Sequence, residues 1–214
     1  MSARPFGVVI PIVTFLLIAL APAASMAGLY RSQQMEIGAA LELRKDGHFR
    51  YQLDYGAVSE HASGDWSFDG RIVRLTTKPA PRKPSFELVR DDPAPAGEVS
   101  IAIEPPGFGA DGYLLDAIVT DASSGEKGLV TTDDDGRVLA GSHKLTVIEP
   151  MVPVYGDVGG RFPLSGERGH HLLLRFHAND LGTAAFDREP LQSTPRGLVL
   201  KRYESEIRFI RVRP

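Results

Sequence analysis

The strongest constraint on the fold is an error-free alternation of apolar and polar side chains over residues 48–55. Successive side chains of a β-strand point to opposite faces, so this stretch predicts a strand with one buried face. The turn-like segment Lys45-Asp46-Gly47 precedes it and predicts a hairpin with Leu41–Arg44. The apolar face of the predicted strand consists of Phe49, Tyr51, Leu53 and Tyr55.

Similar short segments follow along the chain. Asp69-Gly70 separates a segment bearing Trp66 and Phe68 from Arg71–Thr76, and Asp-Gly between apolar runs is a strong hairpin signal. Helix signals are weak and are confined to 31–40 and 179–187. Many short strands with frequent turns predict an all-β chain. The remaining expected strands are Phe86–Arg90, Val99–Glu104, Tyr113–Thr120, Gly128–Thr132, Arg137–Ala140, His143–Ile148, His170–Ala178, Leu198–Tyr203 and Glu206–Val212.

The first 27 residues have the organisation of an export leader. Arg4 is the only charged residue among them, an apolar run follows over 8–21, and small residues stand at Ser25 and Ala27. A basic start, a short apolar stretch and an A-x-A-like end are typical of a secretory signal peptide. The run is shorter than the roughly 20 residues of a membrane-spanning helix. We expect residues 1–27 to be a signal peptide cleaved after Ala27, with an uncleaved N-terminal anchor as the alternative.

Cleavage would leave 187 residues with a net charge of −4, because the only charge lost from the full chain's −3 is that of Arg4. The chain has no Cys, which excludes disulfides, thiolate nucleophiles and Cys-ligated metals. A chain of this length can bury enough surface to fold without crosslinks. We expect a periplasmic or secreted protein with no stable transmembrane span in its mature form. The negative charge disfavours nucleic acid as a partner.

Two proline-rich stretches, 78–84 and 91–97, interrupt the strand pattern. Proline cannot donate a hydrogen bond to a sheet, so we place both stretches outside central strands. The second stretch suggests a domain or subdomain boundary near residues 92–97. We therefore expect an antiparallel β-meander over residues 28–97 and a β-sandwich-like domain over residues 98–214.

Three short motifs lie in the first half: Gly28-Leu29-Tyr30, the hairpin around Asp46-Gly47, and Gly64-Asp65-Trp66. On these motifs, residues 28–77 resemble the lipocalin-like meanders of bacterial envelope proteins. The resemblance implies a half-barrel or lipocalin-like meander. In true lipocalins the Gly-x-Trp motif marks the first barrel strand, whereas here it follows a hairpin. The whole chain also resembles exported proteobacterial proteins for which no activity is implied.

The second half carries Ile118-Val119-Thr120-Asp121, Ser124-Gly125 and a run from Thr131 to Val138. On these residues, 98–148 resembles a transthyretin-like or carboxypeptidase-regulatory-like β-sandwich. The spacing between the glycine turn and the threonine run is shorter than that family usually has. The resemblance implies a non-catalytic module.

Motifs that would declare an enzyme are absent from the sequence. There is no Gly-x-Ser-x-Gly nucleophile elbow, no His-Glu-x-x-His zinc helix, and no Gly-rich nucleotide loop. On a strand, His171 and His177 share a face but lie about 20 Å apart at roughly 3.3 Å per residue, so they cannot hold one metal ion together. We expect no metal and no cofactor, and no catalytic residue can be singled out.

The aromatic residues of the first half are the candidate ligand contacts. Tyr51, Tyr55 and Trp66 would line a cup if the meander points this face inward, although aromatic side chains at period two most often form a core. An apolar cavity at these residues would indicate a small apolar ligand. A solid core would leave protein or polysaccharide surfaces as ligands.

The last 19 residues contain six basic and two acidic side chains. This patch could contact anionic lipid or polysaccharide, but charges on a terminal strand more often block edge-to-edge aggregation. Taken together, the sequence favours an exported, non-catalytic binding or envelope-accessory protein that contacts a small molecule, an envelope protein or polysaccharide. The alternatives are an exported hydrolase with a non-standard carboxylate or histidine site, and a structural or assembly protein that docks through sheet edges.

Overall fold

The protein is all-β in its computed structural model, which describes residues 26–104, 116–133, 135–138, 144–152, 154–156, 159–165 and 168–212. Residues 1–25 of the expected signal peptide (1–27) and the expected strand residues 113–115, 139–140 and 143 lie outside the described residues. The described part of the chain contains no helix that could cross a bilayer.

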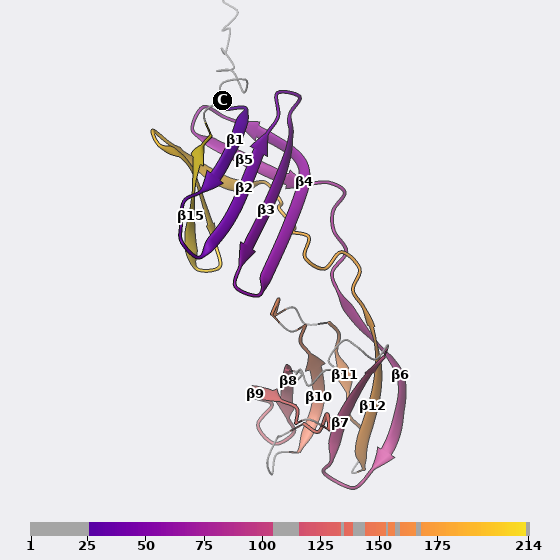
Figure 1. Cartoon of the computed structure of the whole chain (residues 1–214). Helices are drawn as coiled ribbons and strands as arrows, with labels where there is room; N and C mark the ends of the chain where they lie inside the picture. The colour runs from indigo at the N-terminus through magenta and orange to yellow at the C-terminus, as the bar shows by residue number, and fades with distance from the viewer. Residues whose placement is uncertain are drawn as a thin grey trace, which may run out of the picture.

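Eight antiparallel strands close into a barrel in the order β1-β15-β14-β13-β5-β4-β3-β2 (Figure 1). Strands β1 to β5 follow one another along the chain, and strands β13 to β15 come from its C-terminal end. Closure gives every strand two hydrogen-bonded neighbours, which removes exposed sheet edges. The strands are β1 (Gly28–Ser32), β2 (Ile37–Leu43), β3 (His48–Tyr55), β4 (Val58–Phe68), β5 (Ile72–Thr77), β13 (Glu189–Thr194), β14 (Gly197–Arg202) and β15 (Ser205–Arg211).

The alternating pattern of 48–55 forms β3, as expected, and its apolar residues face the barrel interior. Tyr51 lies opposite Leu41 on β2 and opposite Ala62 on β4. The interior is filled by a single apolar cluster to which all eight strands contribute. Leu41, Leu53, Val73, Leu75, Leu191 and Leu200 in this cluster have no solvent exposure.

The two segments with weak helix signals are not helical. In segment 31–40, β1 ends at Ser32 and β2 begins at Ile37. Alternate residues from Ile37 onward are buried, as in a strand with one inward face. The Ser32 hydroxyl accepts a hydrogen bond from the Ala39 amide (3.1 Å). In the second, Asn179 donates its side-chain amide to the Lys83 carbonyl (2.7 Å) and does not cap a helix.

A long insertion between β5 and β13 forms two further sheets, which lie beyond one end of the barrel (Figure 1). One sheet has the order β6-β12-β7 and the other the order β11-β10-β8-β9. They share an apolar cluster whose most deeply buried members include Ile148, Leu172 and Leu174. The strands are β6 (Ser85–Ala94), β7 (Val99–Glu104), β8 (Asp116–Asp121), β9 (Lys127–Thr131), β10 (Leu145–Pro150), β11 (Phe162–Pro163) and β12 (Gly169–His177).

Strand pairing groups the chain differently from the expected division at residue 97. β6 pairs along its length with β12, and β13 to β15 close the barrel begun by β1 to β5. The physical reason is that five consecutive strands leave two open edges, and the three C-terminal strands satisfy both. The basic residues of the terminal strand therefore do not guard an edge, because β15 is paired with both β14 and β1.

The two residues before β1 also contact the barrel. The Tyr30 hydroxyl donates to the Met26 carbonyl (2.7 Å), and the Arg211 guanidinium donates to the Ala27 carbonyl. Ala27 is buried. Cleavage after Ala27 would remove both acceptors from the barrel.

The β4–β5 hairpin turns on Asp69, as the Asp-Gly signal predicts. Its carboxylate accepts hydrogen bonds from the backbone amides of Arg71 (3.0 Å) and Ile72 (2.8 Å) and from the Arg74 guanidinium (2.5 Å). These hydrogen bonds lower the pKa of Asp69 from 3.8 to about 2, and the bond from Arg74 has the largest effect.

This pKa predicts acid sensitivity of the hairpin. A carboxyl group whose pKa is lower in the folded than in the unfolded chain stabilises the fold above the unfolded pKa, and its contribution is lost as the pH falls through the folded pKa. Replacing Asp69 with Asn should lower the free energy of unfolding above about pH 4, and the difference from the native chain should shrink toward about pH 2. Urea unfolding at several pH values measures this. A difference that stays constant with pH would contradict it.

Candidate functional site

A buried ion pair lies inside the barrel at the end that faces the insertion. Glu60 on β4 and Arg202 at the end of β14 both take inward positions in the alternation of their strands. The Glu60 side chain is 7% exposed and that of Arg202 is 22% exposed. A charge in such an environment is stable only when it is paired and hydrogen-bonded.

The pair is bidentate. Arg202 donates from Nε to Oε2 of Glu60 (2.8 Å) and from Nη2 to Oε1 (2.6 Å), and the Tyr203 hydroxyl also donates to Oε1. The guanidinium carbon lies 5.3 Å from the centre of the Phe186 ring and 5.0 Å from that of Tyr203. Burial alone would lower the pKa of Arg202, but the hydrogen bonds and charge of Glu60 raise it on balance. Arg202 therefore stays charged in the pair.

The turn after Arg202 has an uncommon backbone conformation, which fixes the position of Tyr203. Tyr203 and Glu204 have φ angles of +51° and +56°, which correspond to the left-handed region that glycine or asparagine usually occupies. Two such residues in succession form the tight turn that matches the twist of β14 and β15. The turn places the Tyr203 hydroxyl on Glu60, and burial together with that hydrogen bond raises the pKa of the phenol.

Tyr51 lies near the ion pair with its hydroxyl buried. Its ring makes an edge contact with Phe186 at a centroid distance of 5.0 Å. The hydroxyl has no hydrogen-bond partner among the described residues. Burial, followed by the nearby Glu60 carboxylate, raises the pKa of this phenol, so it remains protonated.

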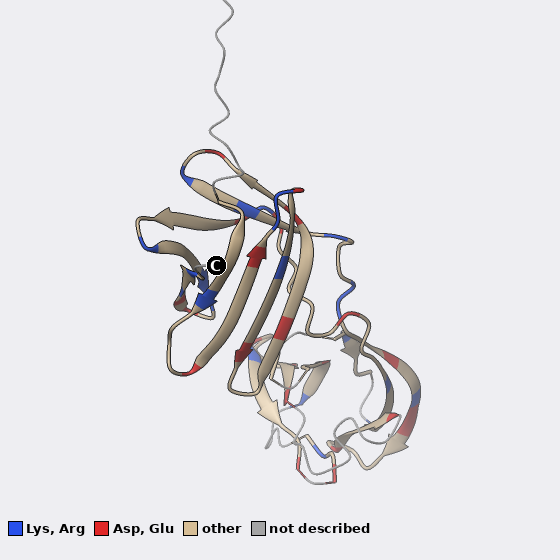
Figure 2. Ribbon diagram, turned by 45° about the horizontal axis from the view of Figure 1, so that its top comes forward, with Lys and Arg blue, Asp and Glu red and all other residues tan. Residues whose placement is uncertain are grey.

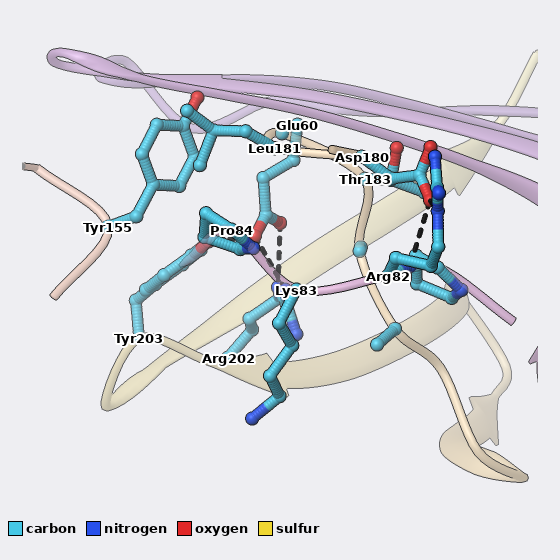
Figure 3. Close-up of a pocket in the computed structure, with 14 residues that line it drawn as sticks. Glu60, Arg82, Lys83, Pro84, Tyr155, Asp180, Leu181, Thr183, Arg202 and Tyr203 are labelled. Carbon is cyan, nitrogen blue, oxygen red and sulfur yellow. Dashed lines mark hydrogen bonds and ion pairs between the residues drawn. The ribbon is translucent and has the colours of Figure 1, made fainter. Parts of the chain in front are cut away.

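An open cleft of about 310 Å³ adjoins the ion pair. Figure 3 shows Tyr155 from the insertion and Tyr203 at one side of the cleft, Arg82 and Asp180 at the other side, and Lys83 between them. The loop 180–185 forms the rest of the lining. The cleft therefore combines barrel, connecting segments and insertion, which are distant in sequence.

Hydrogen bonds hold the two connecting segments against each other and against the barrel. The Asp180 carboxylate accepts from the Arg82 backbone amide (2.8 Å). The His61 amide donates to the Gly182 carbonyl (2.8 Å), and the Ala184 amide donates to the His61 carbonyl (2.9 Å). The Tyr155 hydroxyl donates to the Ser59 carbonyl (2.9 Å). Much of the lining backbone is thus already hydrogen-bonded within the protein.

The charged groups of the cleft differ in how far they are engaged. Both Glu60 oxygens accept hydrogen bonds from Arg202 and Tyr203. Asp180 lies 3.7 Å from the Arg82 guanidinium, whose side chain is 77% exposed. Lys83 is exposed, and its ammonium has no ion-pair partner among the described residues. Lys83 is therefore the one cation of the cleft that has no ion-pair partner among the described residues.

The three aromatic residues expected to bind a ligand do not meet at one cavity. Tyr51 and Trp66 are buried in the barrel cluster, and Tyr55 packs against it. The Trp66 indole donates to the Arg44 carbonyl (2.9 Å), next to the β2–β3 turn, whereas Tyr55 lies at the β3–β4 turn of the opposite end. None of the three lines the cleft.

Histidine–carboxylate contacts exist, but they lie away from the cleft. His170 is 2% exposed and contacts Asp91 at 2.9 Å, and His177 contacts Glu87 at 2.9 Å on the surface. Among the described residues no group of three His, Cys, Asp or Glu side chains could hold a metal ion.

The residues of the cleft were not singled out in the sequence, although one signal for them exists. Glu60 belongs to the same inward-facing series of positions as Ala62, Gly64 and Trp66, but it carries a charge. A charged residue on a buried face indicates a paired partner, but the partner Arg202 is 142 residues away.

No family model, curated protein or solved structure matches this chain. The resemblances to lipocalin-like and transthyretin-like folds therefore stay predictions.

Proposed function

We propose that this chain is an exported, non-catalytic binding protein that holds an acidic carbohydrate unit in the cleft at the end of its barrel. The observation that carries the proposal is the unpaired ammonium of Lys83 at the edge of a cleft that also presents the exposed guanidinium of Arg82. The signal peptide expected over residues 1–27 supports the exported location in this proposal.

The charges favour an anionic ligand. Glu60 is neutralised by Arg202, and Asp180 is engaged by the backbone and side chain of Arg82. The charge left over is that of Lys83. A carboxylate or phosphate placed beside Lys83 and Arg82 would form charge-assisted hydrogen bonds, which are stronger than neutral ones.

The backbone of the cleft favours a carbohydrate over a peptide. An extended peptide usually binds by adding a strand to free backbone groups. Here the backbone amides of His61, Thr183 and Ala184 already donate hydrogen bonds within the protein, so side chains must make the contacts with a ligand. The rings of Tyr155 and Tyr203 offer apolar faces to the C–H groups of a sugar. The cleft volume of about 310 Å³ lies within the range of small-molecule sites.

The arrangement of the carboxylates favours binding over hydrolysis. A glycosidase needs one carboxyl group that delivers a proton and a second that acts as base or nucleophile. The cleft contains Glu60 and Asp180, but hydrogen bonds from Arg202 and Tyr203 occupy both Glu60 oxygens. Neither Glu60 oxygen is left to deliver a proton to a ligand.

The proposal is tested by titrating the protein with trigalacturonic acid and with its fully methyl-esterified form, which has the same rings without charge. We expect saturable calorimetric binding of the acid only. Replacing Lys83 with Met should weaken that binding by about tenfold, as expected for loss of one charge-assisted hydrogen bond of roughly 1.5 kcal/mol. Lys201→Met is the matched control, because Lys201 is an exposed cation on the outside of the barrel.

Two results would count against the proposal. Equal binding of the acid and the ester would show that charge plays no part. An equal loss of affinity in the Lys83 and Lys201 variants would place the ligand outside the cleft.

A further inference from the structure

The barrel end opposite the cleft is formed by three hairpin turns and by both ends of the described chain (Figure 1). The turns are 44–47 between β2 and β3, 69–71 between β4 and β5, and 195–196 between β13 and β14. Gly28 begins β1 at this end, and β15 finishes there at Arg211. We call this end the entry rim.

Each turn of the entry rim carries an exposed cation. Lys45, Arg71 and Arg196 are exposed, and their side chains have no hydrogen-bond or ion-pair partner among the described residues. The acids of the same turns are engaged, since Asp46 pairs with Arg44 (3.1 Å) and Asp69 with Arg74 (2.5 Å). Figure 2 shows basic residues at several turns of this end of the barrel. Three cations of these turns therefore have no ion-pair partner among the described residues.

Two exposed aliphatic side chains lie at the same end of the barrel as these cations. Leu29 on β1 is 37% exposed and Val212, which follows β15, is 40% exposed. The two are neighbours, because the Val212 amide donates to the Leu29 carbonyl (2.8 Å). Basic residues next to exposed aliphatic residues are the composition of surfaces that rest on anionic bilayers.

The chain itself connects the entry rim to an apolar segment. The apolar run of the sequence ends at Ala21, and six residues separate it from Gly28 at the rim. Those residues can span at most about 25 Å when fully extended. For as long as the leader is attached and lies in a membrane, the entry rim must stay close to that membrane.

We propose that the entry rim is a docking surface for an anionic phospholipid bilayer. Lys45, Arg71 and Arg196 would contact the lipid phosphates, and Leu29 and Val212 would reach the interface between headgroups and acyl chains. The cleft at the other end of the barrel would then face away from the membrane. The inference shares the export premise of the proposed function but does not depend on what the cleft binds.

The test measures cosedimentation of the full chain, as recovered from a bacterial host, with vesicles. Intact mass first shows whether the leader is present. We expect binding to phosphatidylcholine vesicles containing 30% phosphatidylglycerol, weak binding to pure phosphatidylcholine vesicles, and release by 0.5 M salt. The triple variant Lys45→Glu, Arg71→Glu, Arg196→Glu should lower the partition coefficient on anionic vesicles by about 100-fold, at roughly 1 kcal/mol per basic residue.

The matched control is Arg50→Glu, Arg161→Glu, Lys201→Glu. It changes the net charge by the same amount at exposed cations outside the rim. We expect the control to retain most of the binding. Equal losses in both triple variants would overturn the proposal in favour of a general charge effect. Equal binding of the native chain to neutral and anionic vesicles would overturn it in favour of the leader alone.

A second measurement locates the contact. Because the chain has no Cys, single substitutions Pro195→Cys at the rim and Ala57→Cys at the far end give unique sites for an environment-sensitive dye. We expect a blue shift on anionic vesicles for position 195 only, and a shift at 57 alone would contradict the orientation. Binding of trigalacturonic acid by the rim variant separates the two proposals, because rim charges do not line the cleft.

Discussion

Replacing Arg202 with Met should lower the free energy of unfolding by about 3 kcal/mol, because it leaves the buried Glu60 carboxylate without its cation. The substitution also removes the guanidinium from the rings of Phe186 and Tyr203. Urea unfolding followed by the fluorescence of Trp66, the only tryptophan, measures the change. Lys201, which precedes Arg202 in β14, is exposed on the outer face of the barrel, so Lys201→Met should change the free energy of unfolding by less than about 0.5 kcal/mol.

The double variant Glu60→Gln, Arg202→Met separates pairing from packing. If the loss arises from the unpaired charge, the double variant should be more stable than Arg202→Met alone. A double variant no more stable than the single one would show that the arginine acts through packing on Phe186. A loss below 1 kcal/mol in the single variant would contradict the buried pair itself.

Replacing Gly197 with Ala is expected to destabilise the barrel by about 3 kcal/mol or more. Gly197 begins β14 with a φ of +147°, and a methyl group there would overlap the carbonyl oxygen of Phe209 on β15. That oxygen belongs to the backbone of a paired strand and cannot move without breaking the ladder. The measurement is again equilibrium unfolding in urea.

Gly128→Ala is the matched control for this substitution. Gly128 also lies in a strand, β9, but an added methyl group would meet no heavy atom within 4 Å and its φ is not in the left-handed range. Because alanine loses less backbone entropy than glycine, we expect no loss of stability. Similar losses in both variants would show that the Gly197 contact is not decisive.

These stability effects bear on the proposed binding site. The ion pair and the Tyr203 turn set the position of one cleft wall, so Arg202→Met should be examined for stability before its ligand binding is interpreted. Lys83 lies in a connecting segment outside both apolar clusters, so its replacement reports on binding without this complication.

Local features of the fold could be predicted because they depend on neighbours in the chain. The alternation over 48–55 predicted β3 and its buried face, and Asp69-Gly70 predicted the β4–β5 hairpin. Lys45-Asp46-Gly47 likewise predicted the hairpin between β2 and β3. In each case strand period or turn chemistry is encoded within a few residues.

The candidate site could not be predicted in the same way. The aromatic residues Tyr51 and Trp66 were candidates because their face was known, but a filled barrel interior makes them core. The cleft residues Lys83 and Arg202 have no local signal, since the position of each depends on a segment more than 90 residues away.

The sequence by itself determined that this chain is built of strands, which side chains of those strands turn inward, and that no cysteine chemistry supports it. Only the tertiary structure decided that β13 to β15 close the barrel and that β6 leaves it for the insertion. The physical reason is that side-chain periodicity determines which face of a strand is buried, whereas the choice of a partner strand depends on open edges anywhere in the chain. The cleft and the entry rim are products of that choice.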